Sequence, residues 1–118
     1  MHKHHISFKH AFDGIIVALK TQPNFRIHLA VSLLAVILGF VLGITKAEWA
    51  IITLTIICGL AIELINTAIE FTVDLLTDQH HILAKHAKDT AAGAMLVFAI
   101  GSLLVGCFIF LPKLWLYI

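Results

Sequence analysis

The sequence predicts an all-α membrane protein, with one amphipathic helix on the membrane surface and three transmembrane helices. Of its 118 residues, 60% are hydrophobic and 13% are charged, whereas ordinary soluble proteins carry about 25% charged residues. A chain this short has too little interior to bury so much apolar surface. These observations exclude a soluble monomer and a disordered segment. The net charge of +1 argues against a nucleic-acid partner.

An amphipathic helix is predicted first, over residues 7–21. Its apolar residues recur at the spacing of one helical face, and they are Phe8, Ala11, Phe12, Ile15, Ile16 and Leu19. Charged and polar residues occupy the opposite face. Ser7 can cap the N-terminus of this helix, and Pro23 can stop it. A helix of this kind lies in the plane of the membrane interface.

Three apolar stretches follow, over residues 27–44, 48–76 and 90–111. Each is long enough to cross a bilayer, which takes about 20 residues. Each is predicted to be a helix, because a lone strand in lipid leaves backbone groups unpaired. The third stretch is expected to stop at Pro112. Residues 1–118 therefore form a single integral membrane domain.

The basic residues set the orientation, because Lys and Arg accumulate on the cytoplasmic side. Six lie before the first span or between the second and third spans: Lys3, Lys9, Lys20, Arg26, Lys85 and Lys88. The other two, Lys46 and Lys113, lie on the opposite side. The N-terminus is expected in the cytoplasm. His28, at the start of the first span, is expected at the interface.

The second span is unusual because it contains carboxylates. Toward its second half it holds Glu63, Asn66, Glu70 and Asp74. At about 100° per residue, they fall within about 80° of one another around the helix. Ionisable groups inside a membrane are expensive and often functional. This face is therefore predicted to look into a protein cleft or a water-filled site at the cytoplasmic edge.

The residues alone allow three interpretations of this face. A Glu can act as a base toward a hydroxyl, another can hold Mg²⁺, and a nearby Lys can neutralise phosphate, which together suit phosphoryl transfer to a lipid alcohol. Proton or cation transport through a small oligomer is the second interpretation. The third is a polar network that only holds helices together.

Four segments resemble the prokaryotic diacylglycerol kinases, small membrane lipid kinases that include the undecaprenol kinases. The segments read SFKHAFDGI (residues 7–15), NFRIH (24–28), AIELINTAIE (61–70) and AKHAKDTAAGAMLV (84–97). The resemblance covers nearly the whole chain and looks most like the undecaprenol kinase branch. It implies a homotrimer in the bacterial cytoplasmic membrane that transfers the γ-phosphate of ATP to undecaprenol, or otherwise to diacylglycerol, with Mg²⁺ as cofactor.

The resemblance also implies roles for individual residues. Glu63 is implied as the catalytic base, Asn66 as the residue that orients base and substrate, and Glu70 as a Mg²⁺ ligand. Lys88 and Asp89 would contact the ATP phosphates and their metals, with Asp74 supporting the site. Further residues correspond to positions that line the nucleotide site in relatives, and they are Lys3, His10, Gln79, His80 and His81.

One position departs from the family pattern. Gln22 stands where the family commonly has a Glu that binds metal, and an amide oxygen can coordinate Mg²⁺ but brings no charge. This departure motivates an alternative, a catalytically impaired relative. A small proton or cation transporter is the other alternative to an active kinase.

Overall fold

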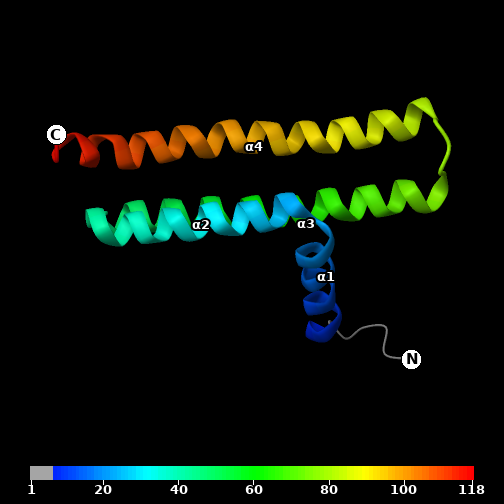
Figure 1. Ribbon diagram of the computed structural model, residues 1–118, viewed down its shortest axis with the longest axis horizontal. Helices are drawn as coiled ribbons and strands as arrows, with labels where there is room; N and C mark the ends of the chain where they lie inside the picture. The colour runs from blue at the N-terminus through cyan, green and yellow to red at the C-terminus, as the bar shows by residue number, and fades with distance from the viewer. Residues whose placement is uncertain (1–6) are drawn as a thin grey trace.

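Residues 7–118 are described by a computed structural model, and they form four helices (Figure 1). In chain order these are α1 (Phe8–Thr21), α2 (Pro23–Leu42), α3 (Lys46–Leu76) and α4 (Ile82–Trp115). Helices α2, α3 and α4 run side by side, and α1 projects sideways from them. The chain is all-helical, as the sequence predicted.

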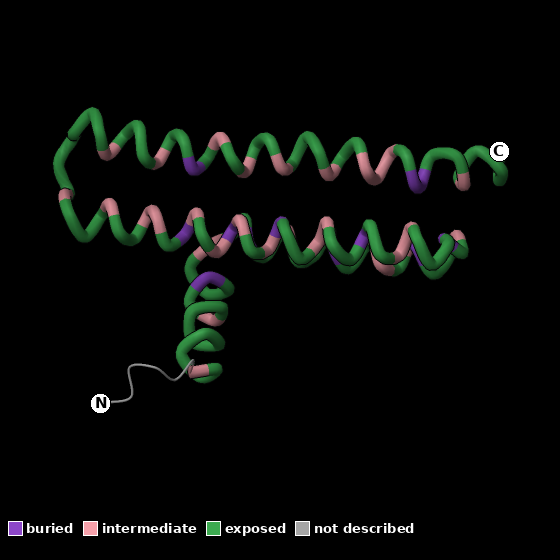
Figure 2. The backbone as a smooth tube through the Cα atoms, turned by 180° about the vertical axis from the view of Figure 1, so that it is seen from behind, coloured by how far each residue is buried: buried purple, intermediate pink, exposed green. Residues whose placement is uncertain are grey.

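Helices α2, α3 and α4 are each long and apolar enough to cross a membrane. Most of their large apolar side chains lie on the surface (Figure 2). In water such exposure would be costly, at about 25 cal/mol per Å² of apolar surface. These exposed apolar side chains therefore need to be covered by lipid or by the apolar surface of another chain. These features identify a membrane protein.

Hydrogen bonds from side chains define the two ends of α1. The Ser7 side chain accepts a hydrogen bond from the His10 backbone N–H at 3.3 Å, which confirms the predicted N-cap. Helix α1 ends at Thr21, and Pro23 is the first residue of α2, a position where the missing N–H costs nothing. The Arg26 guanidinium donates to the carbonyl oxygens of the last turn of α1.

The turn between α2 and α3 is equally well specified. Gly43 ends α2 with φ 66°, a left-handed conformation that favours glycine. Thr45 and Glu48 then form a reciprocal capping box at the start of α3. Lys113 of α4 lies 3.2 Å from Glu48. This ion pair brings the last turn of α4 to the α2–α3 turn, and we call this region the turn end of the bundle.

The opposite end, where residues 77–81 connect α3 to α4, we call the connection end. Helix α3 has 31 residues, about 46 Å at 1.5 Å per residue, which exceeds the roughly 30 Å of hydrocarbon in a bilayer. One or both ends of α3 must therefore extend beyond the hydrocarbon. Asp74 lies within the last turn of α3, at the connection end.

The helices extend beyond the apolar stretches that predicted them. Helix α2 begins at Pro23, four residues before the predicted span, and α4 begins at Ile82, eight residues before its span. Helix α4 also continues through Pro112 to Trp115. Hydropathy marks where lipid begins, whereas caps mark where a helix ends. A proline near the end removes only one backbone donor, so the final turn survives it.

Candidate active site

The polar face of α3 changes from buried to exposed toward the connection end. Glu63 and Thr67 are buried, with exposed fractions of 6% and 5%. Asn66 and Glu70 are half-buried, and Asp74 is exposed. The hydroxyl of Thr67 donates to the Glu63 backbone carbonyl at 2.9 Å, so it leaves the Glu63 carboxylate available for other partners. The predicted shared face therefore exists and runs from the interior to the surface.

Glu63 lines a cavity of about 810 Å³ between α2, α3 and α4. Most of the lining is apolar, including Phe98 and Phe110. No hydrogen bond joins the Glu63 carboxylate to any other group within residues 7–118. The carboxylate borders this apolar space, where a charge is poorly solvated unless a polar partner is present. A molecule bound in the cavity could therefore supply a hydrogen-bond partner for Glu63.

Asn66 lies between Glu63 and Glu70 in the sequence, and its side chain is hydrogen-bonded to Glu70. Its Nδ2 donates to Glu70 Oε1 at 3.2 Å, which fixes the direction of the amide. Its Oδ1 is buried and has no hydrogen-bond partner among the described residues. An unpaired buried acceptor costs about 1–3 kcal/mol. This oxygen therefore lacks a partner that a change in its surroundings could supply.

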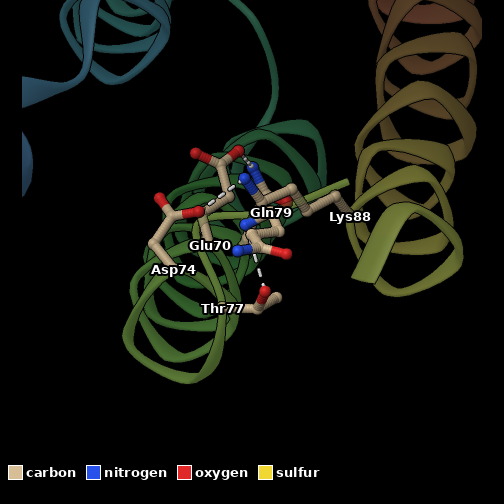
Figure 3. A network of polar contacts seen from close by, with 6 residues as sticks. Glu70, Asp74, Thr77, Gln79 and Lys88 are labelled. Atoms are coloured by element: carbon tan, nitrogen blue, oxygen red, sulfur yellow. Dashed lines mark hydrogen bonds and ion pairs between the residues drawn. The ribbon is translucent and has the colours of Figure 1, made fainter. Parts of the chain in front are cut away.

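Lys88 is the basic residue that the structure brings to this face. Its side chain extends from α4 toward Glu70 and Asp74 on α3 (Figure 3). Its Nζ lies 2.6 Å from Asp74 Oδ1. An ammonium held between two carboxylates at the surface can pair with an incoming phosphate once one of them turns to a metal or to solvent. Acid, amide and base are thus assembled from two helices.

Asp89 is not part of this cluster. It forms an exposed ion pair with Lys85 of its own helix, at 2.5 Å, because residues four apart are neighbours on a helix. Its neighbour Lys88 instead reaches across to α3. Lys88 and Asp89 were predicted to act together on the ATP phosphates, and in this chain they point to different partners.

The remaining predicted site residues are dispersed. His10 lies exposed on α1, and Gln79 and His80 lie exposed in the α3–α4 connection. His81 caps α4, with its Nδ1 accepting from the Leu83 backbone N–H at 3.0 Å. Lys3 lies outside the described residues. None of His10, Gln79, His80 and His81 lines the cavity that contains Glu63.

Gln22 lies in the corner between α1 and α2. Its side-chain amide donates to the Thr21 hydroxyl at 3.2 Å. In residues 7–118 no three His, Cys, Asp or Glu side chains are grouped closely enough to hold a metal ion. Glu70 accepts a hydrogen bond from Asn66 and lies near Lys88. Its carboxylate could hold a cation whose other ligands come from water and from a bound substrate. Mg²⁺ is usually bound in this way, by one or two carboxylates, water and substrate phosphates.

The sequence interpretation missed a polar stripe on the first span. Asn24, His28 and Ser32 recur every four residues and all three line the cavity that contains Glu63. Spacing of this kind places side chains on one helical face. The periodicity alone could have revealed the stripe, but His28 was treated as a lone interfacial residue.

Comparison with known proteins places the chain in a family. A profile described as prokaryotic diacylglycerol kinase matches residues 9–110. The chain belongs to the prokaryotic diacylglycerol kinase family. This match covers α2, α3 and most of α4, and it includes Glu63, Asn66, Glu70 and Lys88. Membership of the family supports a lipid kinase that works on a lipid in the membrane.

Individual members of the family are also similar to the chain. An undecaprenol kinase of Bacillus subtilis is 52% identical over 92% of this chain and 88% of its own length. A diacylglycerol kinase of Synechocystis is 41% identical over 92% of this chain and 63% of its own length. A diacylglycerol kinase of Pseudomonas aeruginosa is 30% identical over 75% of this chain and 72% of its own length.

Proposed function

We propose that this protein transfers the γ-phosphate of ATP to the hydroxyl of a membrane lipid alcohol, with undecaprenol as the preferred substrate. The observation that carries this proposal is the 52% identity to an undecaprenol kinase over 92% of the chain. The buried Glu63 beside an apolar cavity supports it. We place the protein in the bacterial cytoplasmic membrane, with its N-terminus and connection end in the cytoplasm.

In this proposal the residues of the cluster have separate roles. Glu63 takes the proton of the lipid hydroxyl while the hydroxyl oxygen forms a bond to the γ-phosphorus. The bond from that phosphorus to the β–γ bridging oxygen breaks, and ADP leaves. Lys88 pairs with the phosphates, and Asn66 orients the base and the hydroxyl. Asp74 holds Lys88 in position until the nucleotide arrives.

Magnesium fits this set of donors when it arrives with the nucleotide. Glu70 is the proposed protein ligand, and Gln22 is a second one whose amide oxygen brings no charge. When bound, Mg²⁺ would neutralise phosphate charge at this site. His10, Gln79, His80 and His81, with Asp89 and Lys3, are proposed as nucleotide contacts.

We further propose a homotrimer, because several of these contacts lie far from Glu63 within one chain. A neighbouring subunit can supply them without any change in the fold. The exposed apolar faces of α2, α3 and α4 offer surface for such contacts. The molar mass of the protein–detergent complex, measured by light scattering with the detergent subtracted, tests this assembly. A monomeric mass with full activity would exclude it.

The function is tested with purified protein and labelled ATP, with undecaprenol and diacylglycerol supplied in separate reactions. We expect label in undecaprenyl phosphate at the higher rate. Faster labelling of diacylglycerol would overturn the substrate preference, and no labelling of either lipid would overturn the kinase proposal. Glu63→Gln should abolish transfer. Ion flux in liposomes that needs Glu63 but consumes no ATP would instead indicate a transporter.

Gln22 supports a second candidate, a relative with impaired catalysis. Its amide donates to Thr21, and it lacks the charge of the Glu that the family commonly has here. Under this alternative, Gln22→Glu should raise kcat steeply and lower the Mg²⁺ concentration needed for half-maximal rate. An unchanged rate would exclude a missing charge as the limit on catalysis.

A further inference from the structure

The polar stripe of α2 faces Glu63 across the cavity. Asn24, His28 and Ser32 line the cavity from α2, and Glu63 lines it from α3. Ser32 is buried and His28 is half-buried. In a span that is otherwise apolar, three polar residues on one face are expected to have polar groups of the protein or of a ligand nearby. Glu63 is the ionisable group of α3 that lines the same space.

The His28 ring is held in a fixed orientation. It stacks on Phe98 of α4, with 5.7 Å between ring centroids and an interplanar angle of 20°. Gly59 of α3 lies at the edge of both rings, where an added Cβ would overlap His28 Cε1 and Nε2 and also Phe98 Cε2. Glycine is therefore needed at this position for the imidazole to pack against α3. Three helices thus fix one histidine.

Gly59 and Glu63 lie one turn apart on the same face of α3. The backbone positions of Gly59 and Glu63 are about 6 Å apart along the helix axis. The imidazole that packs on Gly59 therefore lies one turn of α3 from the position of Glu63, and both side chains line the same cavity. No hydrogen bond joins the His28 ring to another group in the part of the chain that the structure describes. A neutral imidazole carries one donor and one acceptor nitrogen. Both properties match a hydroxyl, which donates one hydrogen bond and accepts others.

The rest of the cavity indicates what carries that hydroxyl. From His28 and Glu63 the lining continues toward the turn end with apolar residues, among them Leu38, Ile52 and Phe110. The cavity is thus polar at one end and mainly apolar along its remaining length, where the hydroxyls of Thr55 and Ser102 donate to backbone carbonyls of their own helices. A molecule with one hydroxyl on a long hydrocarbon chain has the same distribution of polarity. ATP, which is highly charged, does not.

We infer that His28 binds the hydroxyl of the lipid alcohol and holds it beside Glu63. This inference rests on the proposed function and adds a substrate-binding residue to it. His28 donates to or accepts from the hydroxyl oxygen, Glu63 receives the proton, and the hydrocarbon chain lies along the apolar part of the cavity. Because His28 touches the lipid alone, its loss affects lipid binding and leaves nucleotide binding intact.

The first test is His28→Phe, which keeps a ring to stack on Phe98 and removes both nitrogens. One lost hydrogen bond corresponds to about a tenfold change in affinity. We expect the KM for undecaprenol to rise about tenfold, with the KM for ATP unchanged. Diacylglycerol, which has the same single hydroxyl, is assayed in parallel. An unchanged KM for the preferred lipid, or an equal rise in the KM for ATP, would overturn the inference.

The second test measures binding without ATP or Mg²⁺, so it does not depend on turnover. Wild-type protein in detergent should be stabilised against heat more by undecaprenol than by the corresponding hydrocarbon without the hydroxyl. In His28→Phe the two should stabilise equally. Equal stabilisation of the wild type by both ligands would contradict hydroxyl recognition.

A glycine pair gives an independent check. Gly59→Ala places a methyl group against His28 and Phe98, so it should displace the imidazole and raise the KM for lipid as His28→Phe does. Gly101→Ala is the matched control, because nothing lies within 4 Å of the added Cβ. A normal lipid KM in folded Gly59→Ala protein would argue against the inference. If wild-type protein phosphorylates no lipid, the proposed function itself fails, whereas normal wild-type activity with an unaffected His28→Phe variant defeats only this inference.

Discussion

Lys88 of α4 and Asp74 of α3 form an ion pair, with Nζ and Oδ1 2.6 Å apart (Figure 3). The two residues are fourteen positions apart in the chain and on opposite sides of the α3–α4 connection. Their side chains are 43% and 60% exposed. Ion pairs as exposed as this contribute about 0–1 kcal/mol to stability. Their importance is therefore in placing the ammonium beside Glu70.

Substitution of Lys88 and of Asp74 in turn should distinguish a residue that contacts the substrate from one that only positions its partner. Lys88→Met removes the cation that we propose to pair with phosphate, and we expect kcat/KM for ATP to fall by about 10²–10³-fold. Asp74→Asn leaves the cation in place, and the loss should be about tenfold or less. Thermal unfolding in detergent should be nearly unchanged in both variants. Steady-state assays with varied ATP measure the difference, and a larger loss in Asp74→Asn would show that Asp74 itself contacts the reacting groups.

Substitution of Asn66, which we propose to orient the base, should affect activity much more than the free energy of unfolding. Its Oδ1 is buried without a hydrogen-bond partner in residues 7–118, so Asn66→Leu removes an unsatisfied acceptor while it also removes the bond to Glu70. We expect the free energy of unfolding to change by less than about 1 kcal/mol. Activity should fall at least a hundredfold. Unfolding and kinase assays on the same preparation measure both, and a strongly destabilised variant would mean that this oxygen has a structural partner.

The all-helical fold was predictable because lipid leaves the backbone few choices. Composition and three apolar stretches were sufficient to indicate three spans, and Ser7 was recognised as a cap from its position before an amphipathic pattern. The helix ends were less predictable. Helix α4 passes Pro112 and starts eight residues before its apolar stretch, because polar residues outside the hydrocarbon continue a helix that lipid does not require.

The part of the candidate site that lies on a single helix was predictable from the sequence. The spacing of Glu63, Asn66 and Glu70 fixes a shared face whatever surrounds it. Contacts between helices depend on register, which hydropathy does not encode. The sequence therefore did not reveal that Lys88 reaches α3 while Asp89 turns to Lys85. Nor did it reveal that His28 meets Gly59 and Phe98.

Arg26 should control how firmly α1 is attached to the bundle. Its Nη1 donates to the backbone carbonyls of Leu19 and Lys20 at 2.8 and 3.2 Å, where a helix C-terminus favours positive charge. Arg26→Ala should therefore speed hydrogen exchange in the last turn of α1 while α3 stays protected. Lys20→Ala is the matched control, because it removes a charge and keeps the accepting carbonyl. Equal protection of α1 in wild type and Arg26→Ala would show that packing of Phe25 and Ala18 is sufficient to hold the corner.

Glu48 and Lys113 should stabilise the turn end without affecting the reaction. The pair is 3.2 Å apart and only 24% and 23% exposed, so it is less screened than the pair at Asp74. Glu48→Gln preserves the capping box, in which Gln can replace Glu, and removes the charge. A double-mutant cycle with Lys113→Met should give a coupling energy of about 1 kcal/mol. The KM values for lipid and ATP should be unchanged in all three variants, because the cluster at Glu63 lies about 22 Å along α3 from Glu48. A zero coupling energy would assign the position of the α4 terminus to the apolar contacts of Ile109 and Phe110 instead.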